Sequence, residues 1–430
     1  MTTVADSIAA LAERVAGQRL PLRVRGWDGS EAGPAGAPVV VLTSRTALRR
    51  LMWAPGELGL ARAYVIGELD VDGDLGDALR RVWALSADGT GSRRLTPASW
   101  LAATRTMTRL GGLAPPPSRP RSEARPRGRL HSRRRDAQVI AHHYDLSNAL
   151  YALLLDEHMA YSCGYWTGDA SDGYTVSDAQ RDKLDLICRK LDLHPGMRLL
   201  DVGCGWSALA VHAAQHYGAT VTGVTLSAEQ LAFGRERLAR EGVADLVELR
   251  LQDYRDIPTD APYDAVTAIE MGEHVGKRNY PAFLDRLFRL TAPGGRVLIQ
   301  QMSRGRRHPG GGPFIERYIA PDMHMRPLHE TLALVETAGF EVRDVHALRE
   351  HYARTITAWL DTFERRFDEV VALVGMEQAR VWRLYLVGSI LAFEHNRMGV
   401  DQILAVRTPA NGASGMPATR ADGEPAWSRV

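Results

Sequence analysis

Five short stretches of the sequence carry more polar and aromatic side chains than a structural scaffold needs. They are His142–Asn148, Met159–Trp166, Gln252–Arg255, Glu270–Gly276 and His351–Tyr352. Residues that bind or transform a ligand are commonly found on loops at one edge of a sheet, and we expect most of these stretches to lie there. They are therefore the first places to look for catalytic chemistry.

Glu273 is the strongest candidate for an acid or a base. It follows a predicted strand and has no adjacent arginine, which favours a functional carboxylate over half of a structural ion pair. Cys163 is a lone cysteine and hence most often a small buried hydrophobic residue, so we expect its backbone rather than its thiol to take part. His142 and His143 have no third ligand at a suitable spacing, and we predict no metal site.

A turn with two glycines joins a predicted buried strand to a predicted helix. The strand contains the apolar run around Leu199 and Val202, which is typical of a central parallel strand. Gly203 and Gly205 allow a sharp turn and a close approach of the backbone to a ligand. We predict a nucleotide-like ligand above this turn, at the helix N-terminus. The alternative is an ordinary turn that happens to contain two glycines.

The next predicted strand, Thr220–Thr225, indicates which ligand binds. A dinucleotide site would have an acidic residue at the end of this strand and a third glycine in the turn. The strand ends instead in Thr225-Leu226-Ser227, and Ala208 and Leu209 stand where the third glycine belongs. These differences favour S-adenosylmethionine, which has no pyrophosphate, over a nicotinamide dinucleotide.

Short apolar runs alternate with helical patterns from Asp136 to Arg407, which is typical of a doubly wound α/β sheet. After the first two strands, we predict strands at Val247–Leu251, Asp264–Ile269, Arg296–Gln301, Glu341–Val345 and Ile403–Val406. We predict helices at Ala228–Arg240, Tyr280–Leu290, Glu330–Thr337, Thr355–Val374 and Glu377–Glu394. The expected fold class is therefore α/β, a doubly wound sheet with helical insertions, and a site for S-adenosylmethionine on such a sheet is typical of a class I methyltransferase.

The composition of the chain bounds its class. Its 430 residues, 45% hydrophobic and 24% charged, are enough for two globular domains. We find no apolar run long enough to span a membrane and no signal-peptide pattern. Three scattered cysteines do not make a disulfide framework, so we expect a cytoplasmic protein. The net charge of +2 does not suggest nucleic acid as a partner.

Four segments are predicted. Residues 1–113 form a smaller α+β domain, in which the acidic run Glu68–Asp74 is interpreted as a solvated loop rather than a calcium site. Residues 114–135 form a linker rich in proline and arginine, which is either a solvated tether or a contact with anionic lipid. Residues 136–408 form the methyltransferase domain, and residues 409–430 a disordered tail.

Several motifs resemble those of the cyclopropane-fatty-acyl-phospholipid synthases. They are Tyr161–Trp166, Leu200–Trp206, Val224–Gln230, Asp253–Arg255 and Glu273–Gly276. The resemblance covers roughly residues 144 to 407. Ala54–Tyr64 and Ala392–Asn396 are similar to an actinobacterial branch that makes 10-methylene precursors of 10-methyl fatty acids. An N-terminal domain of this kind accompanies the phospholipid-acting members of the family, which favours membrane phospholipid as the substrate.

The resemblance also implies roles for individual residues. The implied ligands of S-adenosylmethionine are Tyr144, Tyr161, Ser162, Asp201, Gly203, Cys204, Gly205, Thr225, Leu226, Ser227, Gln230, Asp253, Tyr254 and Arg255. The backbone at Cys163, the carboxylate of Glu273 and the hydroxyl of Tyr352 correspond to positions that hold a bicarbonate ion, the proposed base. His274 neighbours this set.

Two positions depart from the family pattern. Gln300 stands where many members have a bicarbonate-binding histidine, and Ser389 where a cysteine is often found. A glutamine can donate a hydrogen bond, but it cannot take up a proton. The departures leave methyl transfer plausible and raise the question of where the later proton goes.

We therefore predict methyl transfer from S-adenosylmethionine to the cis double bond of unsaturated acyl chains in phospholipid, with a cyclopropane product. The alternatives are a 10-methylene product, which would require a partner reductase, and a small-molecule or nucleic-acid methyltransferase. A lipid-binding module with a relic cofactor site is disfavoured because the polar residues at the strand ends are present. We further expect the protein to lie peripherally on the inner face of the membrane. A homodimer is a further expectation.

Overall fold

The computed structural model describes residues 2–87, 97–111, 114–125, 128–133, 135–136, 148–305 and 311–417. The chain divides into two compact units. One comprises Met1–Glu123 with Phe367–Leu391, and the other comprises Ala124–Arg366 with Ala392–Val430. Residues 367–391, which the sequence analysis assigns to the methyltransferase domain, thus cluster with the N-terminal residues.

The first unit is built on a small mixed sheet with strand order β2-β1-β3-β4. Its strands are β1 (Arg23–Arg25), β2 (Glu31–Ala32), β3 (Val39–Leu42) and β4 (Leu69–Asp72). Its helices are α1 (Val4–Ala16), α2 (Arg45–Trp53), α3 (Glu57–Val65), α4 (Leu75–Ala87) and α5 (Pro97–Arg109), with most of α15 (Phe367–Glu394). A capping box between Thr3 and Asp6 starts α1.

The acidic run Glu68–Asp74 was predicted to be a solvated loop, and this prediction is wrong for its central part. Residues Leu69–Asp72 form β4, which pairs antiparallel with β3 and buries Leu69. Pairing with β3 at the edge of the sheet, where Asp72 stays exposed, outweighs the low strand propensity of aspartate.

The second unit contains a seven-stranded sheet with the order β10-β11-β9-β8-β5-β6-β7. Its strands are β5 (Arg198–Val202), β6 (Thr220–Thr225), β7 (Val247–Leu251), β8 (Tyr263–Ile269), β9 (Thr291–Arg304), β10 (Glu341–Ala347) and β11 (Met398–Val406). All neighbours are parallel except β11, which runs antiparallel to both β9 and β10. The predicted α/β methyltransferase fold is confirmed.

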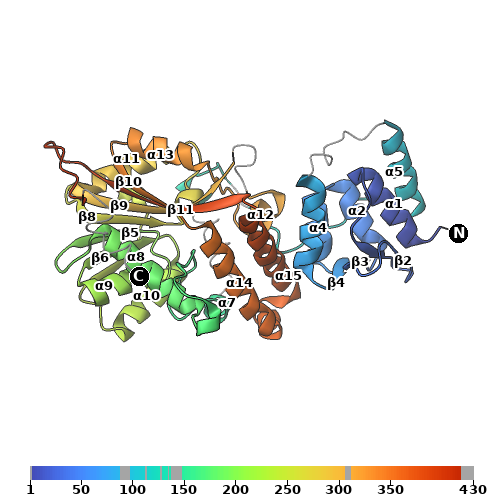
Figure 1. The fold of residues 1–430 in the computed structure, drawn as a ribbon, viewed down its shortest axis with the longest axis horizontal. Helices are drawn as coiled ribbons and strands as arrows, with labels where there is room; N and C mark the ends of the chain where they lie inside the picture. Colours follow the sequence, from blue (N-terminus) through green and yellow to red (C-terminus); the bar gives the residue numbers. More distant parts are fainter. Residues whose placement is uncertain are drawn as a thin grey trace. The chain divides into compact units, whose positions relative to one another are not determined.

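Helices cover both faces of this sheet (Figure 1). The helices and short turns are α7 (Asn148–Leu154), η1 (Ala170–Asp172), α8 (Val176–Leu191), α9 (Ala208–Tyr217), α10 (Ala228–Arg240), η2 (Tyr254–Asp256), η3 (Gly272–His274), α11 (Tyr280–Leu290), α12 (Pro313–Tyr318), α13 (Leu328–Thr337) and α14 (Arg349–Arg365). Leu199 of β5 packs in the core with α8 and α9, whereas Leu200 packs in the core with α11. Successive side chains of this buried strand therefore point to opposite faces of the sheet and pack in two separate hydrophobic cores.

Residues in the predicted linker and in the predicted tail make contacts with the second unit. Two arginines of the predicted linker are paired with the second unit: Arg135 binds Asp322 at 2.6 and 2.7 Å, and Arg133 binds Asp256 at 2.8 Å. Residues 409–417, the described part of the predicted tail, contain no helix or strand. Arg296 donates a hydrogen bond to the carbonyl of Gly415 at 3.2 Å.

Candidate active site

The turn after β5 forms the floor of a cavity. Gly203 has a φ of +85°, and a Cβ at this position would lie 2.9 Å from Cγ of Met271. Gly205 also has a positive φ, +53°. Both positions need glycine because a left-handed backbone is unfavourable for other residues, and Gly203 has no room for a side chain as well. The turn thus lets main chain line the cavity.

Hydroxyl and amide groups replace the missing acid at the end of β6. Thr225 Oγ1 donates to Gln230 Oε1 at 2.8 Å. The N–H of Ser227 in turn donates to Thr225 Oγ1 at 3.1 Å, and Ser227 caps α10 by accepting from the N–H of Gln230. This arrangement presents neutral polar groups beside the turn, as expected for a ligand that carries a ribose but no pyrophosphate.

Asp253 and Arg255, which follow β7, line another side of the cavity. Nε and Nη2 of Arg255 donate to the two carboxylate oxygens of Asp253 at 2.8 and 2.6 Å, and Nη2 also reaches Asp136 at 3.1 Å. The ring of Tyr254 packs edge-on against Phe283, with 5.2 Å between ring centroids. The two charged side chains neutralise one another, and Tyr254 presents an apolar face to the cavity.

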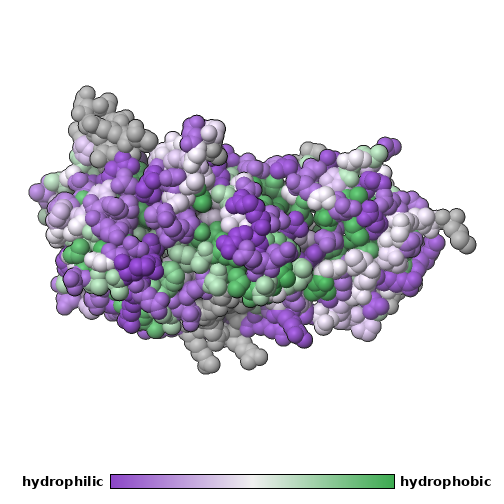
Figure 2. Space-filling view, turned by 90° about the horizontal axis from the view of Figure 1, so that it is seen from below, coloured by the Kyte–Doolittle hydropathy of each residue, from purple (hydrophilic) through white to green (hydrophobic). Residues whose placement is uncertain are grey.

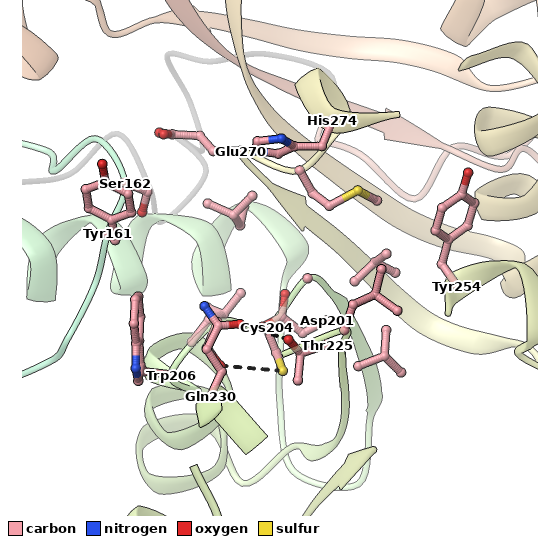
Figure 3. Close-up of a pocket in the computed structure, with 18 of the residues that line it drawn as sticks. Tyr161, Ser162, Asp201, Cys204, Trp206, Thr225, Gln230, Tyr254, Glu270 and His274 are labelled. Atoms are coloured by element: carbon pink, nitrogen blue, oxygen red, sulfur yellow. Dashed lines mark hydrogen bonds between the residues drawn. The ribbon is translucent and has the colours of Figure 1, made fainter. Parts of the chain in front are cut away.

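These walls enclose one cavity together with the loop before α8. The predicted residues that line it are Tyr161, Ser162, Asp201, Gly203, Cys204, Gly205, Thr225, Leu226, Gln230, Asp253, Tyr254, Arg255 and His274. Glu270 and His274 lie along one side, and Gln230, Cys204 and Thr225 along the opposite side (Figure 3). Ser227 is buried beneath the wall as the cap of α10. Tyr144 lies outside the described residues.

Two residues of α8 fix the loop that carries Tyr161 and Ser162. Lys183 Nζ donates to Ser162 Oγ at 2.9 Å, and Gln180 Nε2 donates to the Ser162 carbonyl at 2.8 Å. Positions 180 and 183 lie on the same face of a helix, so both grip one residue of the loop. Burial lowers the pKa of Lys183, an effect that the nearby carboxylates Glu270 and Asp156 oppose.

Glu270, which lies in one of the five polar stretches but was given no role there, is the carboxylate at the centre of the candidate catalytic set. Its Oε1 accepts hydrogen bonds from the N–H of Cys163 and from Nε2 of Gln300, both at 2.8 Å. Its Oε2 accepts one from the hydroxyl of Tyr352 at 2.6 Å. Glu270 also lines the cavity. The backbone of Cys163, Gln300 and Tyr352 therefore meet as expected, but around a different glutamate.

Glu273 lies behind this set. It is fully buried, and its Oε1 accepts from the N–H of Met302 at 2.5 Å rather than from Cys163 or Tyr352. Burial, reinforced by the charge of Glu270, raises the pKa of Glu273 to about 8. Glu273 is thus largely neutral at pH 7, which removes its charge from the neighbourhood of Glu270.

Other titratable groups around the cavity are shifted chiefly by burial. The pKa of His274 falls to about 4, so its imidazole is neutral at pH 7. The pKa of Asp201 rises to about 6, although the hydroxyl of Thr267 donates to it at 2.9 Å. Burial raises the pKa of the Cys163 thiol, which donates to the carbonyl of Gly164. This thiol is therefore not a nucleophile.

Tyr161 lines the cavity, whereas Tyr165 and Trp166 of the same motif are not among the lining residues. Tyr165 packs on His346 and His351, and Trp166 donates to the hydroxyl of Thr355 at 3.0 Å. Ser389 belongs to the part of α15 that clusters with the N-terminal residues. One sequence signal pointed to Glu270, namely its place directly at the end of β8.

Known proteins are similar to this chain over most of its length. Residues 131–403 match the protein family described as mycolic acid cyclopropane synthetase. A protein of Pseudomonas putida named "Probable fatty acid methyltransferase" is 38% identical over 424 residues, which cover 96% of this chain and 99% of that protein. The tuberculostearic acid methyltransferase of Mycobacterium tuberculosis is 34% identical, over 94% of this chain and 92% of that protein.

A solved structure matches as well. The crystal structure of a mycolic acid cyclopropane synthase complexed with SAH and CTAB aligns with a TM-score of 0.58 and 30% identity, covering 63% of this chain and 98% of that one.

Proposed function

The chain belongs to the mycolic acid cyclopropane synthetase family and is an S-adenosylmethionine-dependent methyltransferase of the cyclopropane-fatty-acid-synthase type. From this we propose that it methylates the cis double bond of unsaturated acyl chains in phospholipid. The observation that carries the proposal is the pairing of a nucleotide-type cavity with a hydrogen-bonded carboxylate, Glu270, on its wall.

The cavity has the features that S-adenosylmethionine requires. Gly203 and Gly205 give the backbone access, and the Thr225–Gln230 pair offers a hydroxyl and an amide where a ribose would lie. Tyr161, Ser162 and the residues from Asp253 to Arg255 would complete the binding set. When bound, the cofactor supplies a methyl group on a cationic sulfur, which an isolated alkene needs because it is a weak nucleophile.

The protein's task after methyl transfer is to protect a carbocation on the acyl chain from water. Tyr161 lines the cavity and packs against Trp359, with 5.3 Å between ring centroids. Trp359 also packs against Tyr352, which in turn stacks on Phe393 at 4.7 Å. A ring face near a desolvated cation contributes up to ~2 kcal/mol. Tyr161 thus offers an aromatic ring to the cavity, with the rings of Trp359, Tyr352 and Phe393 packed behind it, and we propose that it helps to exclude water and to stabilise positive charge.

A base then removes one proton from the acyl chain's new methyl group. If the C–H electron pair bonds to the cationic carbon, the product is a cyclopropane. If a hydride shifts first, loss of the proton gives an exocyclic methylene group. The cyclopropane is our primary expectation, and the near full-length match to the tuberculostearic acid methyltransferase favours the methylene product as the second candidate. The latter would require a separate reductase.

Access to phospholipid requires contact with a membrane surface. In the part of the chain that the structure describes, no helix has the length and apolar character to cross a bilayer. Arg119, Arg121, Arg125 and Arg129 are exposed. The face drawn in Figure 2 mixes hydrophilic with hydrophobic residues. Each arginine near an anionic surface contributes about 1 kcal/mol. We propose peripheral binding through these arginines; a homodimer stays a prediction.

The test is an assay on vesicles. Purified protein with S-adenosylmethionine and dioleoyl phosphatidylglycerol should add one carbon to the acyl chains, detected by gas chromatography with mass spectrometry. Dipalmitoyl lipid, which lacks the alkene, is the control. Proton NMR of the product separates a cyclopropane ring from an exocyclic methylene. Unchanged acyl mass with several unsaturated lipids would reject the proposal in favour of a small-molecule substrate or a binding protein.

A further inference from the structure

We propose that the carboxylate of Glu270 is itself the base of the reaction and stands in the place of the bicarbonate ion, so that this enzyme needs no bicarbonate. The inference rests on the proposed function and specifies which atom receives the proton. It contradicts the expectation from sequence resemblance, in which an external anion is held by Cys163, Glu273 and Tyr352.

The hydrogen-bond donors expected to hold the anion are already engaged. The N–H of Cys163, Nε2 of Gln300 and the hydroxyl of Tyr352 all donate to Glu270, at 2.8, 2.8 and 2.6 Å. A bicarbonate ion on the same donors would have to displace this carboxylate and would bring a second negative charge beside it. The residues present therefore do not fit the ion, because a covalently attached carboxylate fills its place.

The backbone at Glu270 shows that this placement is held by the fold. Glu270 has a φ of +52°, a left-handed conformation that is uncommon for residues other than glycine. The conformation is kept by the N–H of Glu270, which donates to the carbonyl of Gln300 at 2.7 Å. A strained backbone conformation of this kind persists where contacts with the surrounding structure hold it in place, and such residues are often found at active sites. Here it follows directly on β8 and turns the side chain toward Cys163 and Tyr352.

Gln300 is oriented to donate to the carboxylate. Its Oε1 accepts from Nε2 of Gln402 at 2.9 Å, which leaves its Nε2 directed at Glu270. Both glutamines are fully buried. Because an amide cannot take up a proton, the glutamine stabilises the base without competing for the proton. The departure from histidine at this position is therefore consistent with a carboxylate base on the protein.

Two opposing effects set the pKa of Glu270. Burial raises the pKa of Glu270, which makes the carboxylate a stronger base, while the hydrogen bonds from Tyr352 and Cys163 and the charge of Lys183 limit the rise. The pKa of the neighbouring Glu273 is raised to about 8, so Glu273 is largely protonated near pH 7. Of the two glutamates, Glu270 is the one that lines the cavity.

The proposed step balances without a further reactant. A C–H bond of the transferred methyl group breaks, its electron pair forms the new carbon–carbon bond or the double bond, and the proton moves to an oxygen of Glu270. The neutral carboxyl group then releases this proton to solvent once product has left. Nothing is oxidised or reduced in this step.

The experiment compares the wild-type enzyme with Glu270→Gly in carbonate-depleted buffer, with and without added sodium bicarbonate. Glycine suits the positive φ of position 270, so this variant should fold, and it opens a space bordered by three hydrogen-bond donors. Glu270→Gln serves as a second variant that keeps the side-chain volume. Glu236→Gln, at an exposed position of α10, is the matched control for loss of a carboxylate.

We expect the wild type to be unaffected by bicarbonate and both variants at 270 to lose 100-fold or more in kcat while still binding S-adenosylmethionine by calorimetry. Bicarbonate should restore at least a tenfold gain in Glu270→Gly only. A wild-type enzyme that slows on carbonate depletion, or a Glu270→Gly variant within threefold of wild type without bicarbonate, overturns the inference.

Calorimetric titration with bicarbonate gives a readout independent of turnover. The wild type should show no binding and Glu270→Gly should show binding, whereas binding to the wild type contradicts the inference. If the wild-type protein methylates no lipid at all, the proposed function fails, and this titration still decides whether the site holds the ion.

Discussion

The hydroxyl of Tyr352 donates a hydrogen bond of 2.6 Å to Oε2 of Glu270, which joins α14 to the end of β8 at the wall of the cofactor cavity. This contact stabilises the charged form of the carboxylate and so lowers its pKa against the raising effect of burial. The properties of the proposed base therefore depend on a residue from a helix far along the chain.

Replacing Tyr352 by Phe should raise the pKa of Glu270 further and reduce the fraction of ionised base. We expect the acid limb of the profile of kcat against pH to move to higher pH, and kcat near neutrality to fall about 10- to 100-fold, as for loss of a hydrogen bond to a charged group. The affinity for S-adenosylmethionine should change little. A uniform loss at every pH, with no shift of the limb, would indicate a structural role.

Glu273 should make stability depend on pH. Its pKa is about 8 in the folded protein against the ordinary value of 4.5, so the folded state holds the proton more tightly. Its contribution to stability is full below about pH 4.5 and is lost as the pH rises to about 8. Glu273→Gln keeps a neutral side chain at every pH.

Across this window the Tm of the wild type should therefore fall relative to that of Glu273→Gln, as measured by calorimetry. The difference should level off above pH 8. Parallel Tm curves for the two proteins from pH 5 to pH 9 would show that Glu273 is ionised throughout.

Gly203→Ala should weaken cofactor binding. The new Cβ would meet Met271 at 2.9 Å in a backbone with a φ of +85°, directly under the cavity. We expect a loss of about 1–2 kcal/mol in the free energy of unfolding from the left-handed backbone. The steric contact should in addition raise the Kd for S-adenosylmethionine by tenfold or more.

Gly196→Ala is the matched control, because Gly196 has a similar φ of +90° but nothing within 4 Å of its added Cβ. It should lose comparable stability and keep the wild-type Kd. Equal Kd values for the two variants would mean that the turn does not approach the ligand.

Local patterns predicted much of the second unit. The helix Ala228–Arg240 and the strand Val247–Leu251 have the predicted bounds because amphipathic and apolar periodicity extends to their ends. Long-range features were not predictable in this way. The clustering of residues 367–391 with the N-terminal unit depends on tertiary packing, and β4 depends on its pairing with β3.

The choice between Glu270 and Glu273 shows the same limit within the site. The two residues lie three positions apart after one strand, and the sequence alone gives no reason for a left-handed backbone at the first of them. Only the hydrogen bonds from Cys163, Gln300 and Tyr352 distinguish the carboxylate on the cavity wall from the buried one behind it.

The central claim, methyl transfer to an alkene followed by removal of a proton from that methyl group, is tested most directly with S-adenosylmethionine carrying a trideuterated methyl group. With oleoyl phospholipid, mass spectrometry should show acyl chains that have gained one carbon bearing two deuterium atoms, whether the product is a ring or a methylene. Retention of all three deuterium atoms, or no incorporation, would contradict the account.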